Sequence, residues 1–248
     1  MSNPNVKPAQ GKLGVMVVGL GAVSTTFMTG VLMTRKGLAK PVGSMTQYDK
    51  IRVGKGADKK YLHYKDIVPI ADLNDIEFAA WDVYPANAYE SAINAEVLKE
   101  KDIEPVADEL KAIKPMRAAF DHNYAKRLDG ENYMKGATRW EMVENIRKDI
   151  RDFKAAKNLD RIVVLWAAST EVYVPVDEKV HYKLAALEAA MKADDKEHVA
   201  PSMCYAYAAL KEGAPFIMGA PNTTVDIPAM WELAEQTKMP IAGKDFKT

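Results

Sequence analysis

An apolar run that breaks into glycine limits the fold of this chain more than any other feature. Residues 14–26 read GVMVVGLGAVSTT, with valine-rich positions before the glycines and small hydroxyl residues after them. A short buried strand, a tight turn and the start of a helix produce this order. The spacing Gly19-x-Gly21-x-x-Ser24 differs from the dinucleotide-binding fingerprint only at its last position. That position requires a small residue for packing between helix and strand, and serine is small.

In the fingerprint, the first glycine makes the turn and the second lets the backbone approach a pyrophosphate at the helix N-terminus. We therefore predict that Gly19 and Gly21 hold a dinucleotide; the alternative is a strand–helix turn without a ligand. An acidic residue at the end of the second strand usually holds the adenosine ribose. Asp82 ends the apolar run 76–81 and is the better candidate, although a helix N-cap or a turn would also explain it. Asp49 has roughly the usual spacing from the glycines but lies in a polar segment.

Strand-like and helix-like patterns alternate along the chain. Short, β-rich apolar runs occur at 13–18, 76–81, 161–167, 214–219 and 239–243. Helical patterns cover 23–36, 86–100, 138–158, 177–193, 200–213 and 228–238, and Thr138 with Glu141 has capping-box spacing. This alternation predicts an α/β fold with a Rossmann-type, doubly wound parallel sheet and right-handed crossovers. We expect a disordered lead-in over 1–11 and a dinucleotide-binding domain over 12–248, with a Lys- and Gly-rich surface insertion at about 35–75.

Charge balance and cysteine content exclude several kinds of protein. Lys plus Arg and Asp plus Glu both number 34, so no global field attracts nucleic acid or an anionic membrane surface. No apolar run approaches the roughly 20 residues that span a bilayer. Cys204 is the only cysteine, which fits a reducing cytoplasm, and we interpret it as a small buried residue rather than a nucleophile. The four histidines lack metal-ligand spacing, so we predict no metal site.

Three polar stretches follow predicted strands, at the sheet edge where ligands of parallel α/β folds bind. They cover residues 169–171, 222–226 and 244–247. The hydroxyl residues of the first could contact a cofactor or start a helix, and the second reads equally as an Asn- and Thr-rich turn. Lysines in a stretch like the third usually face solvent, so composition alone leaves its role open.

Seven stretches, in this order, resemble the myo-inositol-1-phosphate synthases of the bacterial type. They are VGLGAVSTT, WDVYPANAYESA, RKDIRDFK, LDRIVVLWAASTEVY, HVAPS, LKEGAPFIMGAPNTT and IAGKDFKT. The patterns LW-A-(S/N)-T-E-x-Y and G-x-P-(x)-N-T are far more specific to this family than the glycine turn is. The resemblance extends over roughly residues 12–248.

The resemblance implies a cytoplasmic, homotetrameric isomerase of inositol and phospholipid biosynthesis that binds NAD and regenerates it in each cycle. In this family D-glucose 6-phosphate is oxidised at C5, enolised, closed by an intramolecular aldol step and reduced to 1D-myo-inositol 3-phosphate. Matched by motif, the residues implied to contact the cofactor are Gly19, Gly21, Ala22, Ser24, Asp82, Ala168, Ser169, Thr170, Ser202 and Thr223. The residues implied to be catalytic are Asn222, Asp245 and Lys247.

Members of this family continue past the DFK motif into GQT and a stretch that supplies more lysines, much of the substrate pocket and the tetramer-forming sheet. This sequence ends at Thr248, so we expect it to lack most of that second domain, whose start we place at about 240–248. We expect reduced or marginal NAD affinity and no isomerase activity from this polypeptide alone. An NAD-binding fragment without turnover is the first alternative, and an NAD-dependent sugar-phosphate dehydrogenase is a more distant one.

Overall fold

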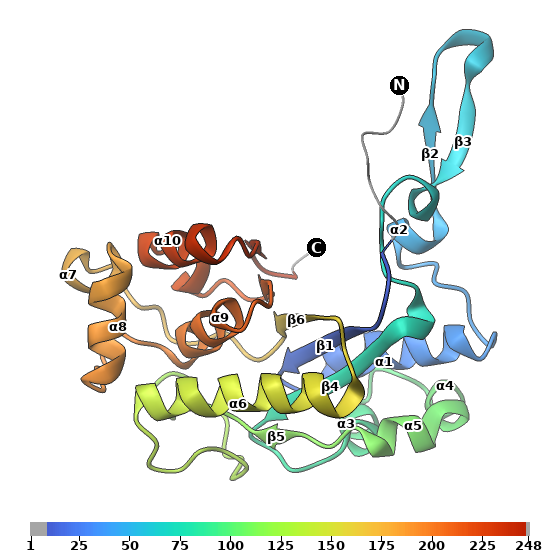
Figure 1. Ribbon diagram of the computed structural model, residues 1–248. Helices are drawn as coiled ribbons and strands as arrows, with labels where there is room; N and C mark the ends of the chain where they lie inside the picture. Colours follow the sequence, from blue (N-terminus) through green and yellow to red (C-terminus); the bar gives the residue numbers. More distant parts are fainter. Residues whose placement is uncertain (1–8, 247–248) are drawn as a thin grey trace.

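Six parallel strands form the main sheet in the computed structural model, which describes residues 9–246 (Figure 1). The strands are β1 (Leu13–Val18), β4 (Ile76–Asp82), β5 (Met116–Arg117), β6 (Arg161–Trp166), β7 (Phe216–Met218) and β8 (Ile241–Gly243). Their order across the sheet is β5-β4-β1-β6-β7-β8. This is the doubly wound arrangement in which the strand order reverses beside the first strand, so the predicted Rossmann-type sheet is confirmed.

The register of the three central strands brings their carboxyl ends to one level. Val18 of β1 pairs with Trp81 of β4 on one side and with Trp166 of β6 on the other. The residues that follow continue the ladder, because Gly19 N–H donates to the Trp81 carbonyl and Ala167 N–H donates to the Val18 carbonyl, both at 2.8 Å. The glycine turn therefore lies between the ends of β4 and β6.

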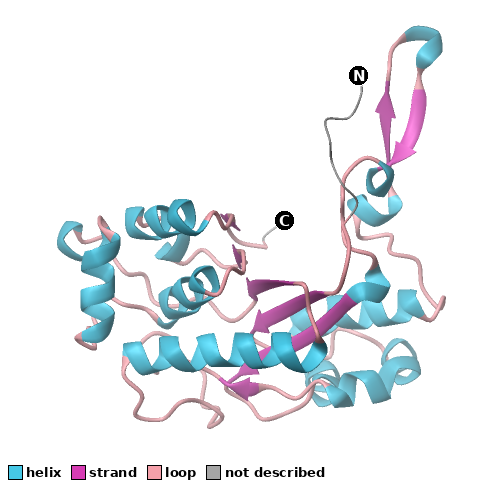
Figure 2. Cartoon of the chain, viewed as in Figure 1, coloured by secondary structure: helices cyan, strands magenta, loops and turns pink. Residues whose placement is uncertain are grey.

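Helices cover both faces of the sheet, as Figure 2 shows. One face carries α1 (Ala22–Arg35), α3 (Ala88–Asn94), α4 (Glu100–Ile103) and α5 (Ala107–Ala112), and the other carries α6 (Arg139–Lys157), α7 (Glu178–His181), α8 (Leu184–Lys192), α9 (Pro201–Lys211) and α10 (Pro228–Thr237). Strand β1 supplies both cores in alternation, with Met16 and Val18 in one and Val17 in the other. This alternation follows from the two-residue period of a strand.

Most predicted helices form, and the differences have local causes. The helix predicted over 138–158 is confirmed as α6, with the Thr138–Glu141 capping box at its start and Asn158 in the left-handed conformation at its end. The helix predicted over 86–100 is wrong in extent, because the chain leaves the helix after Asn94 and Glu96 adopts a positive φ of 53°. The one predicted over 177–193 is divided into α7 and α8 by Lys183, which is extended.

A projecting arm occupies the segment between α1 and β4. It contains α2 (Met45–Tyr48) and an antiparallel hairpin of β2 (Lys50–Val53) and β3 (Lys60–His63), which Figure 1 shows extending away from the sheet. Neither strand was predicted, and β5 was also missed because it contains only two residues. Arg35 attaches the base of the arm, donating from Nε to the Leu73 carbonyl at 2.6 Å.

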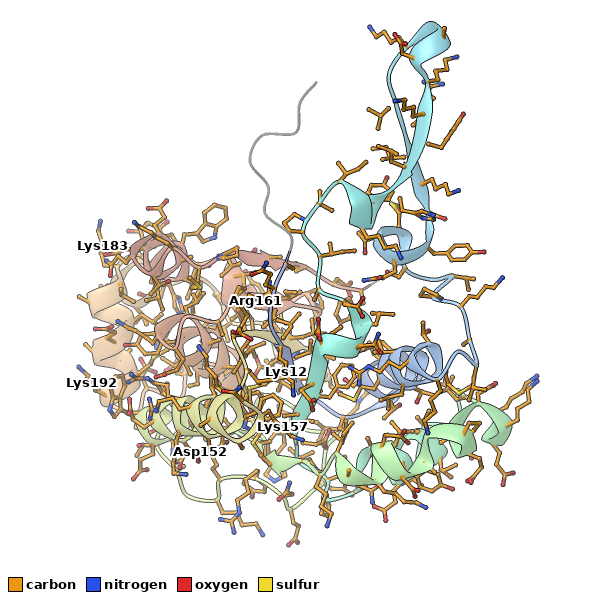
Figure 3. The ribbon with its side chains drawn as sticks, turned by 45° about the vertical axis from the view of Figure 1, so that its right-hand side comes forward. Lys12, Asp152, Lys157, Arg161, Lys183 and Lys192 are labelled. Atoms are coloured by element: carbon orange, nitrogen blue, oxygen red, sulfur yellow. The ribbon has the colours of Figure 1, made fainter. Side chains whose placement is uncertain are left out.

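The amino edge of the sheet is charged and lies opposite the glycine turn. Lys12 and Lys157 approach Glu77 at 4.0 and 3.6 Å, and Arg161 lies beside them (Figure 3). Exposed pairs of this kind contribute little to stability. Across residues 9–246, no helix combines the length and apolar character that crossing a membrane requires.

Candidate functional site

Gly19 makes a turn that no other residue can make without strain. Its φ is +93°, and an added Cβ would lie 2.6 Å from Ala168 Cα and 2.7 Å from Ala168 N. The turn therefore touches the end of β6 directly, backbone against backbone. This contact explains the first glycine of the spacing in physical terms.

Gly21 has the opposite surroundings, because no atom lies within 4 Å of an added Cβ. It is the N-cap of α1, where no side chain caps the helix and no acidic residue lies in the first turn. The first N–H groups of α1 thus have no intrahelical partner, and the helix dipole favours an anion there. The open space at Gly21 lets such an anion approach the backbone closely.

Ser24 occupies the third position of the spacing and is fully buried. Its hydroxyl donates to the Gly19 carbonyl at 2.5 Å. The side chain is therefore directed into the interface between α1 and β1, where it holds the turn. The interpretation of Ser24 as a small packing residue agrees with this geometry, while its contact with a cofactor stays a prediction.

We expect Gly19→Ala and Gly21→Ala to have different effects, because only the first alanine would meet protein atoms. Gly19→Ala should lower the free energy of unfolding by about 1–3 kcal/mol through backbone strain at a positive φ. Gly21→Ala should leave stability within about 0.5 kcal/mol of the wild type and weaken dinucleotide binding. Urea denaturation and ligand titration of both variants measure the two effects. Equal losses of stability in both would contradict the assignment.

Asp82 ends β4 beside the glycine turn. One carboxylate oxygen accepts from Leu20 N–H at 2.5 Å, and the other accepts from Tyr84 N–H at 2.8 Å. Burial raises the pKa of Asp82, while these backbone donors oppose that rise. Asp49 lies instead in the arm, next to a separate hollow lined by Lys50 and other residues of that segment. Of the two acidic candidates, Asp82 is the one that the fold brings to the glycines.

A cavity of about 380 Å³ opens where β1, β4 and β6 end. Its lining residues include Gly19, Gly21, Ala22, Trp81, Asp82, Phe120, Tyr124, Trp166, Ala168, Ser169, Glu171 and Pro201. A more open hollow of about 580 Å³ continues past Asp82, between the start of α1 and α3, with Tyr84 and Glu90 in its wall. The two hollows share Gly21, Ala22, Asp82 and Tyr84, so together they form an elongated site with the helix N-terminus at its middle.

The residues after β6 divide between two hollows. Ala168 and Ser169 line the main cavity, whereas Ser169 and Thr170 line an adjoining hollow of about 420 Å³ that also contains Lys126 and Arg127. The Ser169 and Thr170 side chains are exposed. Their position at the sheet edge matches the prediction from the polar stretch after this strand, and their contact with a ligand stays a prediction.

Glu171 is a buried carboxyl that sequence reasoning did not assign to the site. It lines the main cavity, and it accepts from Ser202 N–H at 2.9 Å and from Asn222 Nδ2 at 3.1 Å, with a third bond from the Ser202 hydroxyl. Burial raises the pKa of Glu171 to about 7, and the Ser202 donors oppose that rise. An acidic residue directly after a strand and two hydroxyl residues was the available signal.

The residues predicted at 202, 222 and 223 lie around this carboxyl. Asn222 forms two hydrogen bonds with Glu171, because its Oδ1 also accepts from Glu171 N–H at 3.1 Å. Thr223 Oγ1 donates to the Val174 carbonyl at 3.0 Å. The buried side chains of Ser202, Asn222 and Thr223 thus fasten the segment after β6. Their catalytic or cofactor roles stay predictions.

The buried Arg139 forms an ion pair with Asp121, which lines the main cavity. Its guanidinium donates to Asp121 Oδ2 at 2.7 Å and to the Val199 carbonyl at 2.7 Å, and it lies 5.6 Å from the Tyr124 ring centre. Burial raises the pKa of Asp121, but the hydrogen bond and charge of Arg139 together with hydrogen bonds from Asn123 outweigh it, and the net shift is downward. No local pattern in the sequence predicts this pair.

The last described residues approach the sheet beyond β7. Asp245 is exposed with a φ of +73°, and its N–H donates to the Met218 carbonyl at 3.3 Å. The Phe246 ring packs on Gly219, where an added Cβ would lie 2.1 Å from it. Asp245 follows β8, which β6 and β7 separate from β1, and Lys247 lies outside the described residues.

Other titratable groups have structural surroundings. Cys204 is buried in α9, and burial raises the pKa of its thiol to about 12, which agrees with the interpretation as a small buried residue. His181 accepts from Asp177 N–H at 2.9 Å and contacts the His198 carbonyl at 2.8 Å. Within residues 9–246, no group of three or more His, Cys, Asp or Glu side chains could hold a metal ion.

The sheet order, the glycine turn and the cavity at its edge define a Rossmann-type dinucleotide-binding domain. Residues 13–248 match the family model described as myo-inositol-1-phosphate synthase, which carries the name of an NAD-binding domain. The chain belongs to the myo-inositol-1-phosphate synthase family, whose domain of this type takes NAD as its cofactor.

Relatives named as inositol-3-phosphate synthases support the same family. Inositol-3-phosphate synthase 1 of Bacteroides thetaiotaomicron is 62% identical over 98% of this chain and 56% of its own length. Inositol-3-phosphate synthase 1 of Oryza sativa is 35% identical, with 96% of this chain and 49% of the relative covered. The chain therefore spans about half the length of the curated relatives it matches.

Solved structures agree with this fold. The crystal structure of inositol-3-phosphate synthase from Caenorhabditis elegans matches with a TM-score of 0.90 at 29% identity, covering 98% of this chain and 50% of that one. A myo-inositol-1-phosphate synthase-related protein from Thermotoga maritima matches with a TM-score of 0.67 at 20% identity, covering 96% and 55%. The second likeness concerns the fold alone.

Proposed function

We propose that this chain binds NAD across the carboxyl ends of β1, β4 and β6 and supplies the dinucleotide-binding half of an inositol-3-phosphate synthase. One observation carries the binding proposal. The uncapped N-terminus of α1 opens onto free space at Gly21, in the middle of an elongated hollow that also passes Asp82. A dinucleotide, in which an anionic pyrophosphate joins two nucleosides, fits such a site.

Different residues of the site would bind different parts of NAD. The pyrophosphate would sit on the backbone of Gly21 and Ala22, and Asp82 would accept hydrogen bonds from the adenosine ribose. Each Asp82 oxygen has one backbone donor and keeps capacity for a second. Ala168 and Ser169 would face the nicotinamide end, on the β6 side of the turn. When bound, NAD supplies a hydride acceptor that the reaction later restores.

The activity proposed for the complete site is conversion of D-glucose 6-phosphate to 1D-myo-inositol 3-phosphate. Enolisation beside a ketone needs a proton acceptor and partners for the developing oxyanion and the phosphate dianion. Asn222, Asp245 and Lys247 are the candidates on this chain for those tasks, and the proposed assembly is a homo-oligomer in the cytoplasm. The relatives named as synthases, and the length shared with them, support this assignment.

Calorimetric titration with NAD tests the binding proposal. We expect weak but saturable binding, which Gly21→Ala reduces because the added methyl group occupies the space before the helix N-terminus. Absence of binding at millimolar NAD by the folded wild type would contradict the proposal.

Product analysis separates the candidate activities. Inositol phosphate formed from D-glucose 6-phosphate without accumulation of NADH is the signature of the isomerase. Accumulation of NADH would favour a sugar-phosphate dehydrogenase. NAD binding with neither product would identify the chain as a binding unit without turnover.

A further inference from the structure

The buried Glu171 carboxyl and Asp82 lie on opposite flanks of the glycine turn. Asp82 ends β4 and Glu171 follows β6, while β1 runs between those two strands. Both residues line the same cavity. If Asp82 holds the adenosine ribose, as proposed above, the cavity wall at Glu171 faces the nicotinamide end of the dinucleotide.

Hydroxyl groups around Glu171 can support two protonation states without moving. Ser202 Oγ lies between the Glu171 carboxyl and Thr224 Oγ1, which is 2.5 Å away, and either hydroxyl of that pair can donate. With Glu171 ionised, Ser202 donates to the carboxylate and Thr224 donates to Ser202. With Glu171 protonated, the chain reverses, so Glu171 donates to Ser202 and Ser202 donates to Thr224.

Other charged and titratable groups face this carboxyl from each neighbouring element. Arg139 of α6 attracts the ionised form, whereas Asp121 disfavours it. Tyr124 and Cys204 also interact electrostatically with Glu171. Asn222 and Ser202 supply neutral donors. Since burial raises the pKa of Glu171 to about 7, the carboxyl changes charge near neutral pH.

We propose that Glu171 is a positioning residue that discriminates between the oxidised and reduced forms of the bound dinucleotide through its charge. The proposal rests on the proposed NAD binding. The oxidised nicotinamide ring carries a positive charge that the reduced ring lacks, and the rest of the molecule is identical in the two forms. An ionised carboxylate in the wall near that ring therefore stabilises NAD⁺ relative to NADH, while a protonated carboxyl does not.

The size of the effect follows from Coulomb's law. Two unit charges about 10 Å apart, at an effective dielectric constant of about 20, change an equilibrium constant by roughly ten- to twentyfold. We therefore expect the ratio of the NADH and NAD⁺ dissociation constants to rise by about tenfold between pH ~5.5 and pH ~8.5. An isomerase of this kind keeps its cofactor bound through oxidation and reduction. Its relative affinity for NAD⁺ and NADH would therefore depend on pH.

Titrations of the folded wild-type chain with each nucleotide over this pH range test the proposal. Trp81 and Trp166 line the cavity, so quenching of their fluorescence reports binding of both nucleotides.

Glu171→Gln should make the ratio independent of pH. Ser202→Ala removes a hydrogen bond from both states, but the bond to the ionised form is the stronger one, so the midpoint of the change should move to higher pH. Glu188→Gln removes a carboxyl that bonds Tyr207 and Lys211 on α9, and it should leave the wild-type curve intact.

The outcomes separate this proposal from the one it rests on. If the wild type binds neither nucleotide, NAD binding itself is wrong. If it binds both with a ratio that does not change with pH, or if Glu171→Gln reproduces the wild-type curve, only the role of Glu171 is overturned. Should Glu171→Gln fail to fold, the wild-type curve and the shift in Ser202→Ala decide. A purely structural role would weaken both nucleotides equally and leave their ratio constant.

Discussion

Arg139→Met should lower the free energy of unfolding by about 2–4 kcal/mol, because it leaves the largely buried Asp121 carboxylate without its counterion. The Arg139 side chain is 1% exposed and that of Asp121 is 12% exposed. Removing the guanidinium also frees the Val199 carbonyl, to which Nε now donates. Urea denaturation at neutral pH measures the loss.

Two further variants identify the cause of that loss. Lys148→Met removes an exposed cation from the same helix, where it pairs with Asp152, and should cost no more than about 0.5 kcal/mol. Combining Arg139→Met with Asp121→Asn should restore part of the lost stability, since no buried charge then remains unpaired. A loss below about 1 kcal/mol in the single variant, or no recovery in the double variant, would contradict the account.

Stability should fall as the pH rises from about 4.5 towards neutrality, and Glu171 should be the main cause. Its pKa is about 7 in the folded chain, compared with the ordinary value of 4.5 that it regains on unfolding. The folded state therefore binds more protons between these values. Its contribution to stability is complete below pH ~4.5 and is lost as the pH rises through about 7, with a total of roughly 3 kcal/mol.

Comparison with Glu171→Gln isolates this contribution. The amide does not titrate, so the wild type should lose stability relative to the variant as the pH rises from about 5 to about 8. The amide also places a second donor against Asn222 Nδ2, which adds a loss that is independent of pH. Chemical denaturation at each pH measures both the pH-dependent and the pH-independent difference in stability. A constant difference between the two proteins would show that Glu171 keeps its ordinary pKa.

Local patterns were sufficient to predict the sheet and many of the residues at the carboxyl ends of its strands, where the candidate cofactor site lies. The glycine spacing, the run that ends at Asp82 and the capping box at Thr138 each have a short-range physical cause, and each forms as expected. The polar residues at 169 and 170 also reach the predicted edge. Parallel strands of similar length bring such residues together without further information.

Contacts between distant segments could not be predicted in the same way. Glu171 is buried because Ser202 and Asn222, 31 and 51 residues further along the chain, satisfy its oxygens. The Arg139–Asp121 pair likewise depends on how α6 packs against the loop after β5. The hairpin of β2 and β3 was missed because each strand has only four residues and lies in a segment rich in lysine and glycine, which are uncommon in strands.

The arm between α1 and β4 has a consequence for protein engineering. Among residues 9–246, neither hydrophobic core includes a residue of 36–75. The turn of the β2–β3 hairpin also lies far from the carboxyl ends of β1, β4 and β6 (Figure 1). Chain length at such a tip affects folding only weakly, because the entropy of loop closure grows slowly with loop size. The tip is therefore the natural site for grafting a reporter domain or an affinity peptide without disturbing the nucleotide cavity.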